Sequence, residues 1–219
     1  MNFRLISFST AVIGSALAAD VFTAPLTTKR QAHSKARLVR RSAQRQSNPP
    51  IKRVGIDGDI YETAILQVGV DFCITGSDVS YDAWYEWYPD YAYDFDNFEI
   101  SAGNVIKVTI DATSSTGGTA IIENISTGNS ATHSFSNVTD GSLCEYNAGW
   151  IVEDFESDSE LIDFANFGTV TFSDAIATSG NTSYGPSTAT IMDIKQADTV
   201  LTYSSVTDDI VTITYYKSS

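Results

Sequence analysis

Three stretches of this sequence set a polar side chain among glycine, aromatic or aliphatic residues on one face of a predicted strand. The alternation groups them by face as Gln67 with Gly69 and Asp71, Glu86 with Trp84 and Tyr88, and Glu153 with Ile151 and Phe155. One such strand alone is more typical of a solvent-facing surface, but three of them favour a groove. A carboxyl group beside aromatic rings loses hydration, which raises its pKa and suits it to acid or base catalysis.

The sequence has few residues that could support other catalytic mechanisms or a metal site. His133 is the only histidine after residue 53, and no Gly-x-Ser-x-Gly motif accompanies it, so we interpret it as an exposed polar residue. One histidine and two cysteines are too few for a Cys/His zinc site. The Asp57-Gly58-Asp59 turn could touch calcium, but a polar turn explains it equally well. We expect neither a metal nor a cofactor.

Charge divides the chain into two parts. Up to Arg53 there are ten basic residues and one acidic residue, whereas from Val54 onward there are three basic and 26 acidic residues. The second part would be repelled by phosphate groups, so nucleic acid and anionic membranes are not expected partners.

The N-terminus resembles an export signal. Arg4 precedes an apolar run over 5–17, and small residues follow at its end. This predicts a signal peptide over 1–18 and a secreted, extracellular protein. The run is too short for a membrane span, and no later apolar run approaches the length that a span needs.

The basic segment over 19–53 lacks apolar periodicity and contains three dibasic pairs, at 29–30, 40–41 and 52–53. We interpret it as a pro-segment that is cut at such a pair. Residues 54–219 then form one domain.

This domain is predicted to be all-β. β-branched and aromatic runs recur between Gly, Asn, Asp and Ser clusters, without convincing helical spacing. The expected strands are 62–73, 82–89, 105–113, 118–125, 131–136, 149–155, 168–176, 188–194, 198–204 and 209–216. Many short strands without long helices indicate a sandwich or a closed barrel.

If the protein is secreted, its cysteines could be oxidised and its asparagine sequons could be glycosylated. Cys73 and Cys144 could form a disulfide in an oxidising compartment, although the sequence cannot place their Cα atoms. Asn124, Asn137 and Asn181 each begin a glycosylation sequon.

Six blocks of the domain resemble the glutamic peptidases, or eqolisins, which are pepstatin-insensitive acid peptidases secreted by fungi. The blocks are VGIDGD at 54–59, TAILQVGVD at 63–71, YDAWYEWYP at 81–89, GSLC at 141–144, WIVEDFE at 150–156 and FANFGTV at 164–170. The match runs from Val54 almost to the C-terminus.

The resemblance implies a sandwich of two antiparallel sheets, of the concanavalin or jelly-roll kind, whose concave face binds an extended peptide. It assigns the catalytic pair to Gln67 and Glu153. Supporting or substrate-binding positions fall on Asp57, Asp71, Glu86, Tyr88 and Phe155. The implied partners are protein or peptide substrates, and the implied state is a monomer.

The chain also departs from the family. Members carry several tens of residues before the block at 54–59, with strands and groove aromatics that this chain lacks, so the N-terminal part of the sandwich is expected to be incomplete. The family pairs the cysteine at Cys144 with a position where this chain has Tyr61, and Gly149 replaces a common acidic residue.

Three functions therefore stay open from the sequence. The first is a secreted acid endopeptidase in which Glu153 activates water and Gln67 stabilises the oxyanion. The second is a catalytically impaired sandwich that binds peptide or polysaccharide in an aromatic groove. The third is a glycosidase that uses paired carboxylates such as Glu86 and Glu153.

Overall fold

The structure is a computed structural model that describes residues 3–10, 52–57, 64–75, 78–153, 156–157, 160–161, 164, 166–196 and 198–216. In this part of the chain nearly all regular structure is β-strand, and the paired strands run antiparallel. A single 3₁₀ turn, Pro186–Thr188, is the helical element among the described residues. The predicted all-β class is therefore confirmed.

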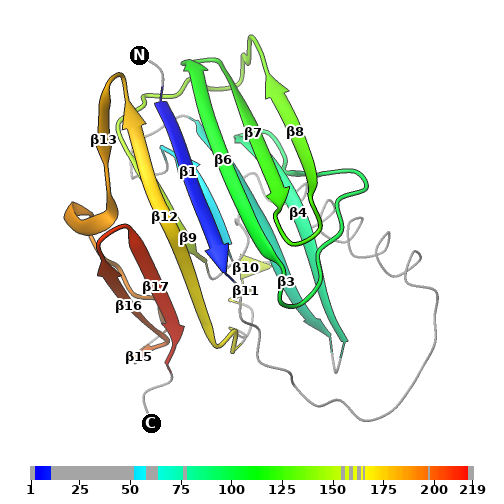
Figure 1. The fold of residues 1–219 in the computed structure, drawn as a ribbon, viewed down its shortest axis with the longest axis vertical. Coiled ribbons are helices and arrows are strands. Elements are labelled where there is room, and N and C mark those ends of the chain that lie inside the picture. Colours follow the sequence, from blue (N-terminus) through cyan, green and yellow to red (C-terminus); the bar gives the residue numbers. More distant parts are fainter. Residues whose placement is uncertain are drawn as a thin grey trace.

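The larger sheet has eight strands (Figure 1). In spatial order they are β16 (Thr202–Thr207), β17 (Ile210–Tyr215), β12 (Thr169–Ser179), β1 (Phe3–Thr10), β6 (Val105–Ser114), β7 (Gly117–Asn124) and β8 (Asn129–Phe135), with β13 (Thr182–Tyr184) pairing β12.

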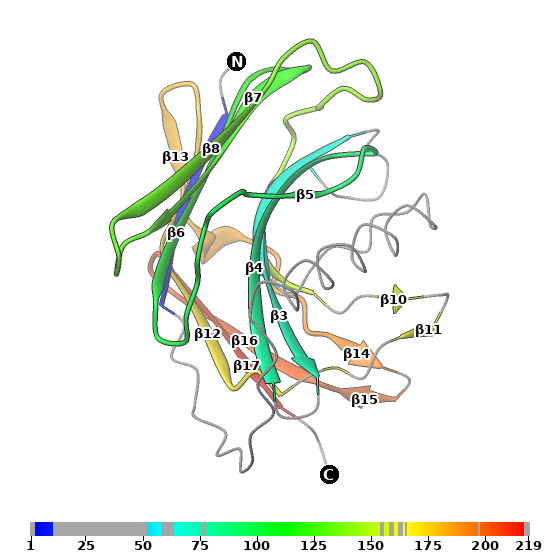
Figure 2. The same cartoon turned by 90° about the vertical axis from the view of Figure 1, so that its right-hand side faces the viewer.

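The smaller sheet has five strands and lies against the larger one (Figure 2). Its order is β5 (Tyr93–Asp94), β4 (Asp78–Tyr88), β3 (Ile65–Thr75), β2 (Lys52–Ile56) and β9 (Ala148–Val152). Two short hairpins complete the strands: β10 (Glu156–Ser157) with β11 (Glu160–Leu161), and β14 (Lys195–Gln196) with β15 (Thr199–Val200).

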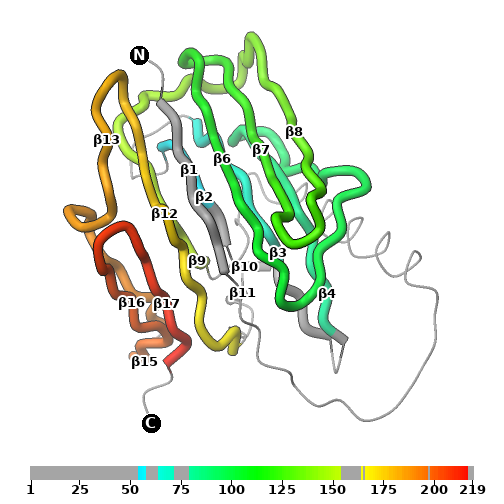
Figure 3. Tube along the Cα trace, in the orientation of Figure 1, coloured from blue at the N-terminus to red at the C-terminus, as the bar shows by residue number. Residues whose placement is uncertain are grey.

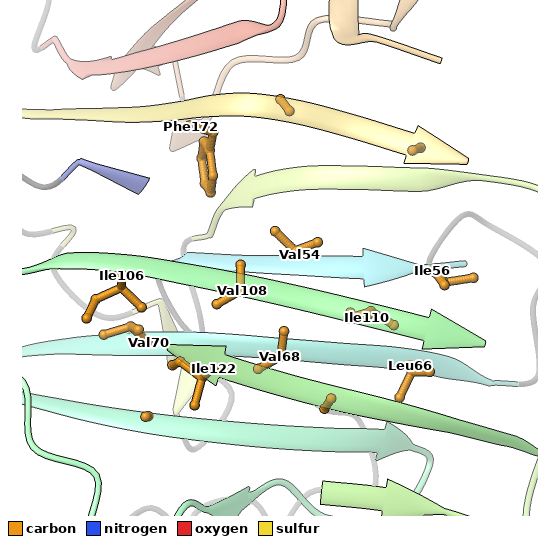
Figure 4. Packing of buried hydrophobic residues seen from close by; sticks show 14 of the residues in the cluster. Val54, Ile56, Leu66, Val68, Val70, Ile106, Val108, Ile110, Ile122 and Phe172 are labelled. Atoms are coloured by element: carbon orange, nitrogen blue, oxygen red, sulfur yellow. The ribbon is translucent and has the colours of Figure 1, made fainter. Parts of the chain in front are cut away.

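The apolar core fills the space between the two sheets. β3 packs on β6 and β7, and β2 packs on β6 (Figure 3). Alternate residues of each strand point inward, because side chains of a strand alternate between its two faces. Figure 4 shows this set, which includes Val54 and Ile56 from β2, Leu66, Val68 and Val70 from β3, Ile106, Val108 and Ile110 from β6, Ile122 from β7 and Phe172 from β12.

One glycine on β7 has no room for a side chain. A Cβ atom at Gly118 on β7 would lie 2.6 Å from the Asp111 carbonyl oxygen and 2.9 Å from Leu66 Cδ2 on β3. Such distances are too short for any larger residue without movement of the backbone. The absence of a side chain at Gly118 therefore allows β7 to lie close to both β6 and Leu66 of β3.

Most expected strands are present with shifted ends, but one prediction is wrong. Residues 188–194 contain β-branched residues, yet the structure describes a 3₁₀ turn that begins at Pro186 and then irregular chain up to Ile194. Residues 188–193 are exposed and pair with no described strand. β-propensity without a partner strand does not make a strand.

The predicted signal peptide and pro-segment stay predictions. Residues 11–51 lie outside the described residues, and the backbone of Phe3–Thr10 forms β1, which pairs with β6 and β12. Among the residues that the structure describes, no helix has the length and apolar character needed to span a bilayer.

The three predicted glycosylation sequons differ in accessibility. Asn137 and Asn181 are exposed, whereas Asn124 is completely buried. The Asn124 amide donates hydrogen bonds to the Glu99 carbonyl oxygen (3.1 Å) and to Asn104 Oδ1 (2.9 Å). A glycan on Asn124 would replace one of the two amide hydrogens and would need space at a completely buried atom, so only Asn137 and Asn181 are accessible in the folded domain.

Candidate active site

The candidate site begins with the two faces of β3. Leu66, Val68 and Val70 enter the core, so Gln67 and Asp71 point to the opposite face of the five-stranded sheet. The predicted alternation along this strand is therefore correct. Gln67 is 0% exposed and Asp71 is 7% exposed, so these polar side chains are buried outside the apolar core.

The register of the sheet brings Glu86 directly across from Gln67. The two residues are cross-strand partners on β3 and β4, and Gln67 Nε2 donates a hydrogen bond to Glu86 Oε2. Glu86 is 2% exposed. Burial of an amide and a carboxyl group without a partner would be costly, so this bond both satisfies and orients the Gln67 side chain.

Aromatic side chains flank Glu86 as the alternation predicts. Trp84 and Tyr88 lie two residues before and after it on β4, on the same face. Trp84 is completely buried and lies across from Gly69, while Tyr88 is half-buried and lies across from Ile65. Aromatic side chains on β4 therefore lie on both sides of the Glu86 carboxyl group, which accepts the hydrogen bond from Gln67.

On the side of Gln67 away from β4, the next two strands carry glycines at the same level of the sheet. We call this line of paired residues across the sheet the Gln67 row. Gly55 on β2 pairs with Gln67, and Gly149 on β9 pairs with Gly55. Neither residue has a side chain that could rise above the sheet, so these two positions add no side-chain atoms beside the Gln67 amide. A Cβ atom at Gly149 would lie 3.1 Å from Ile151 Cδ1. This glycine row was missed because it depends on the register of three strands.

Glu153 lies one residue beyond the end of β9 and is half-buried. Val152 pairs with Lys52, and Lys52 pairs with Val70, so the chain reaches Glu153 one position past the level of Val70. Glu153 and Gln67 therefore come from strands that are separated by β2. Their assignment as a catalytic pair stays a prediction, and Phe155 lies outside the described residues.

Asp57 directly follows the last residue of β2. Its carboxylate accepts hydrogen bonds from the loop before β9 and not from the Gln67–Glu86 pair. Asp71 is the cross-strand partner of Asp82. Of the residues expected at the site, the structure therefore joins Gln67 with Glu86 directly and places Asp71 on the same strand face.

The interpretation of His133 as an exposed polar residue is wrong. The residue lies on β8 and stacks on Tyr85 of β4, with ring centroids 3.9 Å apart and an interplanar angle of 12°. Phe135 contacts both rings, so this aromatic cluster links β8, at the edge of the larger sheet, to β4 of the smaller sheet. Burial lowers the pKa of His133. The pKa of Tyr85 is raised, mainly by burial and to a smaller extent by the negative charges of Asp96 and Asp94.

The structure does not test the possible disulfide between Cys73 and Cys144. Cys144 is exposed, and the side chain of Cys73 lies outside the described residues, so their pairing stays a prediction. In the described part of the chain, no group of three or more His, Cys, Asp or Glu residues is placed to hold a metal ion.

Comparison with known proteins gives consistent matches. A sequence model of the Peptidase A4 family matches residues 18–215. Aspergillopepsin-2 from Aspergillus niger is 62% identical over 162 residues, which are 74% of this chain and 57% of that protein. The chain thus spans just over half the length of this curated relative.

Two solved structures share the fold. The crystal structure of aspergilloglutamic peptidase from Aspergillus niger has 60% sequence identity and a TM-score of 0.72, and covers 76% of this chain and 98% of that chain. A structure of scytalido-glutamic peptidase with a transition state analog inhibitor has 33% identity and a TM-score of 0.75, and covers 97% of this chain and 92% of that chain.

Proposed function

Because the chain belongs to the Peptidase A4 family, we propose that it is an acid endopeptidase that hydrolyses peptide bonds with Gln67 and Glu153 as its catalytic pair. The observation that carries this proposal is the buried Gln67 amide, held by Glu86 on the sheet face opposite the core. A buried polar pair of this kind adds nothing to apolar packing and costs free energy to desolvate, which favours a functional role.

The proposed reaction uses both groups without a cofactor. The Glu153 carboxylate takes a proton from a water molecule, and the water oxygen attacks the carbonyl carbon of the scissile peptide bond. The carbonyl oxygen becomes an oxyanion. Glu153 then passes the proton to the nitrogen of the leaving amine, and the C–N bond breaks.

The chemistry of the Gln67 side chain fits the role of stabilising the oxyanion. Its amide does not ionise in the useful pH range, and its NH₂ group carries two hydrogens. Its Nε2 group donates to Glu86 in this structure, and in the proposed reaction the same group donates to the oxyanion as that charge develops. A positioned donor of this type contributes about 2.7–4 kcal/mol at the transition state.

The surroundings of Gln67 suit an extended peptide. Gly55 and Gly149 have no side chains that would block a peptide main chain beside the Gln67 amide. On the other side of Gln67, Trp84 and Tyr88 flank Glu86 on β4. A further structure of scytalido-glutamic peptidase was solved with a peptide based transition state analog, which supports peptide substrates for this chain as well.

The experiment is cleavage of denatured haemoglobin or casein in acidic buffer that contains pepstatin. We expect Glu153→Gln to abolish cleavage and Gln67→Ala to reduce it by about two to three orders of magnitude, the effect of losing one oxyanion donor. Matched controls are Glu99→Gln and Gln196→Ala, which do not belong to the five-stranded sheet and should keep full activity. Full activity in either site variant would remove the assignment of the pair. A chain that binds casein but leaves it intact would instead be a catalytically impaired binding domain.

A further inference from the structure

Asp57 makes contacts that differ from those of a proton-transfer residue. Its side chain is 3% exposed, and both carboxylate oxygens accept hydrogen bonds from main-chain N–H groups. Oδ2 accepts from Cys144 (2.6 Å) and Glu145 (2.8 Å), and Oδ1 accepts from Tyr146 (2.8 Å). One short stretch of backbone, the 144–146 loop, therefore engages the whole carboxylate.

The main chain strengthens this attachment. The Asp57 N–H donates to the Asn147 carbonyl oxygen (3.0 Å), so four hydrogen bonds join the end of β2 to residues 144–147. Glu145 has a φ of 56°, and this left-handed conformation turns successive N–H groups toward one point, as in an anion-binding nest. Asp57 itself has a φ of 60°, a conformation that Asp and Asn tolerate better than most residues.

The 144–146 loop leads directly into β9. Among the described strands, β9 is a five-residue edge strand with β2 as its ladder partner. Its second residue, Gly149, belongs to the Gln67 row, and its last residue, Val152, precedes Glu153. A short edge strand has few bonds of its own, so the attachment at its start helps to determine where the whole strand lies.

We propose that Asp57 is a positioning residue, which clamps the 144–146 loop and thereby fixes β9 and Glu153 relative to Gln67. The role in catalysis rests on the proposed function. Asp57 transfers no proton in this proposal, because both of its oxygens are held by backbone donors.

The test compares Asp57→Asn with Asp208→Asn. Asparagine keeps the size and tolerates the positive φ, but replaces one acceptor oxygen by a donor. Asp208 is a matched control because it also has a positive φ, 53°, and lies exposed in the turn between β16 and β17. Two quantities are measured on the full chain: amide hydrogen exchange at Cys144, Glu145 and Tyr146, and kcat and KM with a peptide substrate.

We expect Asp57→Asn to speed exchange at these three amides by about tenfold or more, and to lower kcat by about tenfold with KM changed by less than about twofold. Asp208→Asn should leave the exchange and both constants unchanged. A residue with only a structural role would lower the melting temperature but keep kcat per folded molecule.

Several results would overturn the clamp. Unchanged exchange in Asp57→Asn would do so, as would an unchanged kcat per folded molecule. Lost activity with slow exchange retained would show that Asp57 acts directly in the chemistry. If the variant does not fold, fast exchange at the three amides of the unaltered chain would overturn the clamp. If the unaltered chain cleaves no peptide, the proposed function fails, and the exchange measurement alone decides whether the clamp exists.

Discussion

The five-stranded and eight-stranded sheets share one apolar core, but their second faces carry different kinds of residue. On β3 and β4 the second face holds Gln67, Asp71 and Glu86, all of them buried. On β8 and β12 of the larger sheet, residues of the second face are exposed or half-buried. An exposed polar face needs no explanation, whereas a buried one costs free energy unless its groups are paired.

This difference separates the structural from the functional part of the sandwich. The larger sheet is apolar on one side and mostly solvated on the other, as is usual for antiparallel sheets, although Thr109 on the second face of β6 is also buried. The smaller sheet keeps polar groups buried on its second face, where protein stability alone would favour apolar residues. The candidate site therefore belongs to the smaller sheet.

Core substitutions in the larger sheet should have the largest effect on stability. Ile110 on β6 is completely buried, whereas Ile176 on β12 faces outward and is 36% exposed. We expect Ile110→Ala to lower the free energy of unfolding by about 2–5 kcal/mol, since it removes buried methyl groups and leaves a cavity. Ile176→Ala should lower it by less than about 1 kcal/mol. Urea denaturation of both variants measures the difference, and equal losses would contradict the assignment of the two faces.

The polar face of the smaller sheet should respond in activity rather than in stability. Glu86→Gln keeps the shape of the side chain but weakens the acceptor for Gln67 Nε2. We expect kcat/KM to fall by about three- to tenfold, which corresponds to a hydrogen bond of about 1 kcal/mol. Glu99→Gln, an exposed carboxylate before β6, is the control. A variant that is as active as the unaltered chain would show that Glu86 does not orient Gln67.

The sequence predicted local features of this sheet well. Alternation along β3 separates Gln67 and Asp71 from Leu66, Val68 and Val70, because the side-chain period of a strand is a property of the strand itself. The same reasoning placed Trp84, Glu86 and Tyr88 on one face of β4. These predictions needed no knowledge of neighbouring strands.

Features that depend on distant partners could not be predicted. The pairing of Gln67 with Glu86 and the row with Gly55 and Gly149 both depend on register between strands. The stacking of His133 on Tyr85 joins the two sheets, so alternation within β8 gave no sign of it. The bonds from the 144–146 loop to Asp57 cross more than eighty residues of chain.

His133 links the sheets and should make stability depend on pH. Burial lowers the pKa of His133 from its ordinary value of 6.5, so protonation favours the unfolded chain. The stabilising contribution is complete above the unfolded pKa and is lost as the pH falls through the lower folded pKa. His133→Phe keeps a ring against Tyr85 without the charge, so we expect the variant to gain melting temperature relative to the unaltered chain as the pH falls below about 6.5. A constant difference across that pH range would contradict this cause.

The smallest effect is expected on the solvated side of the larger sheet. Lys107 on β6 and Glu123 on β7 are cross-strand partners, and Lys107 Nζ lies 2.7 Å from Glu123 Oε2. Their side chains are partly exposed, so water screens the pair and the Coulombic gain is small. A double-mutant cycle with Lys107→Met and Glu123→Gln should give a coupling energy of about 0.2–1 kcal/mol at low salt, and less at high salt. A coupling well above this range that does not fall with salt would mean that the pair is effectively buried, and that the larger sheet also keeps a desolvated polar site on its second face.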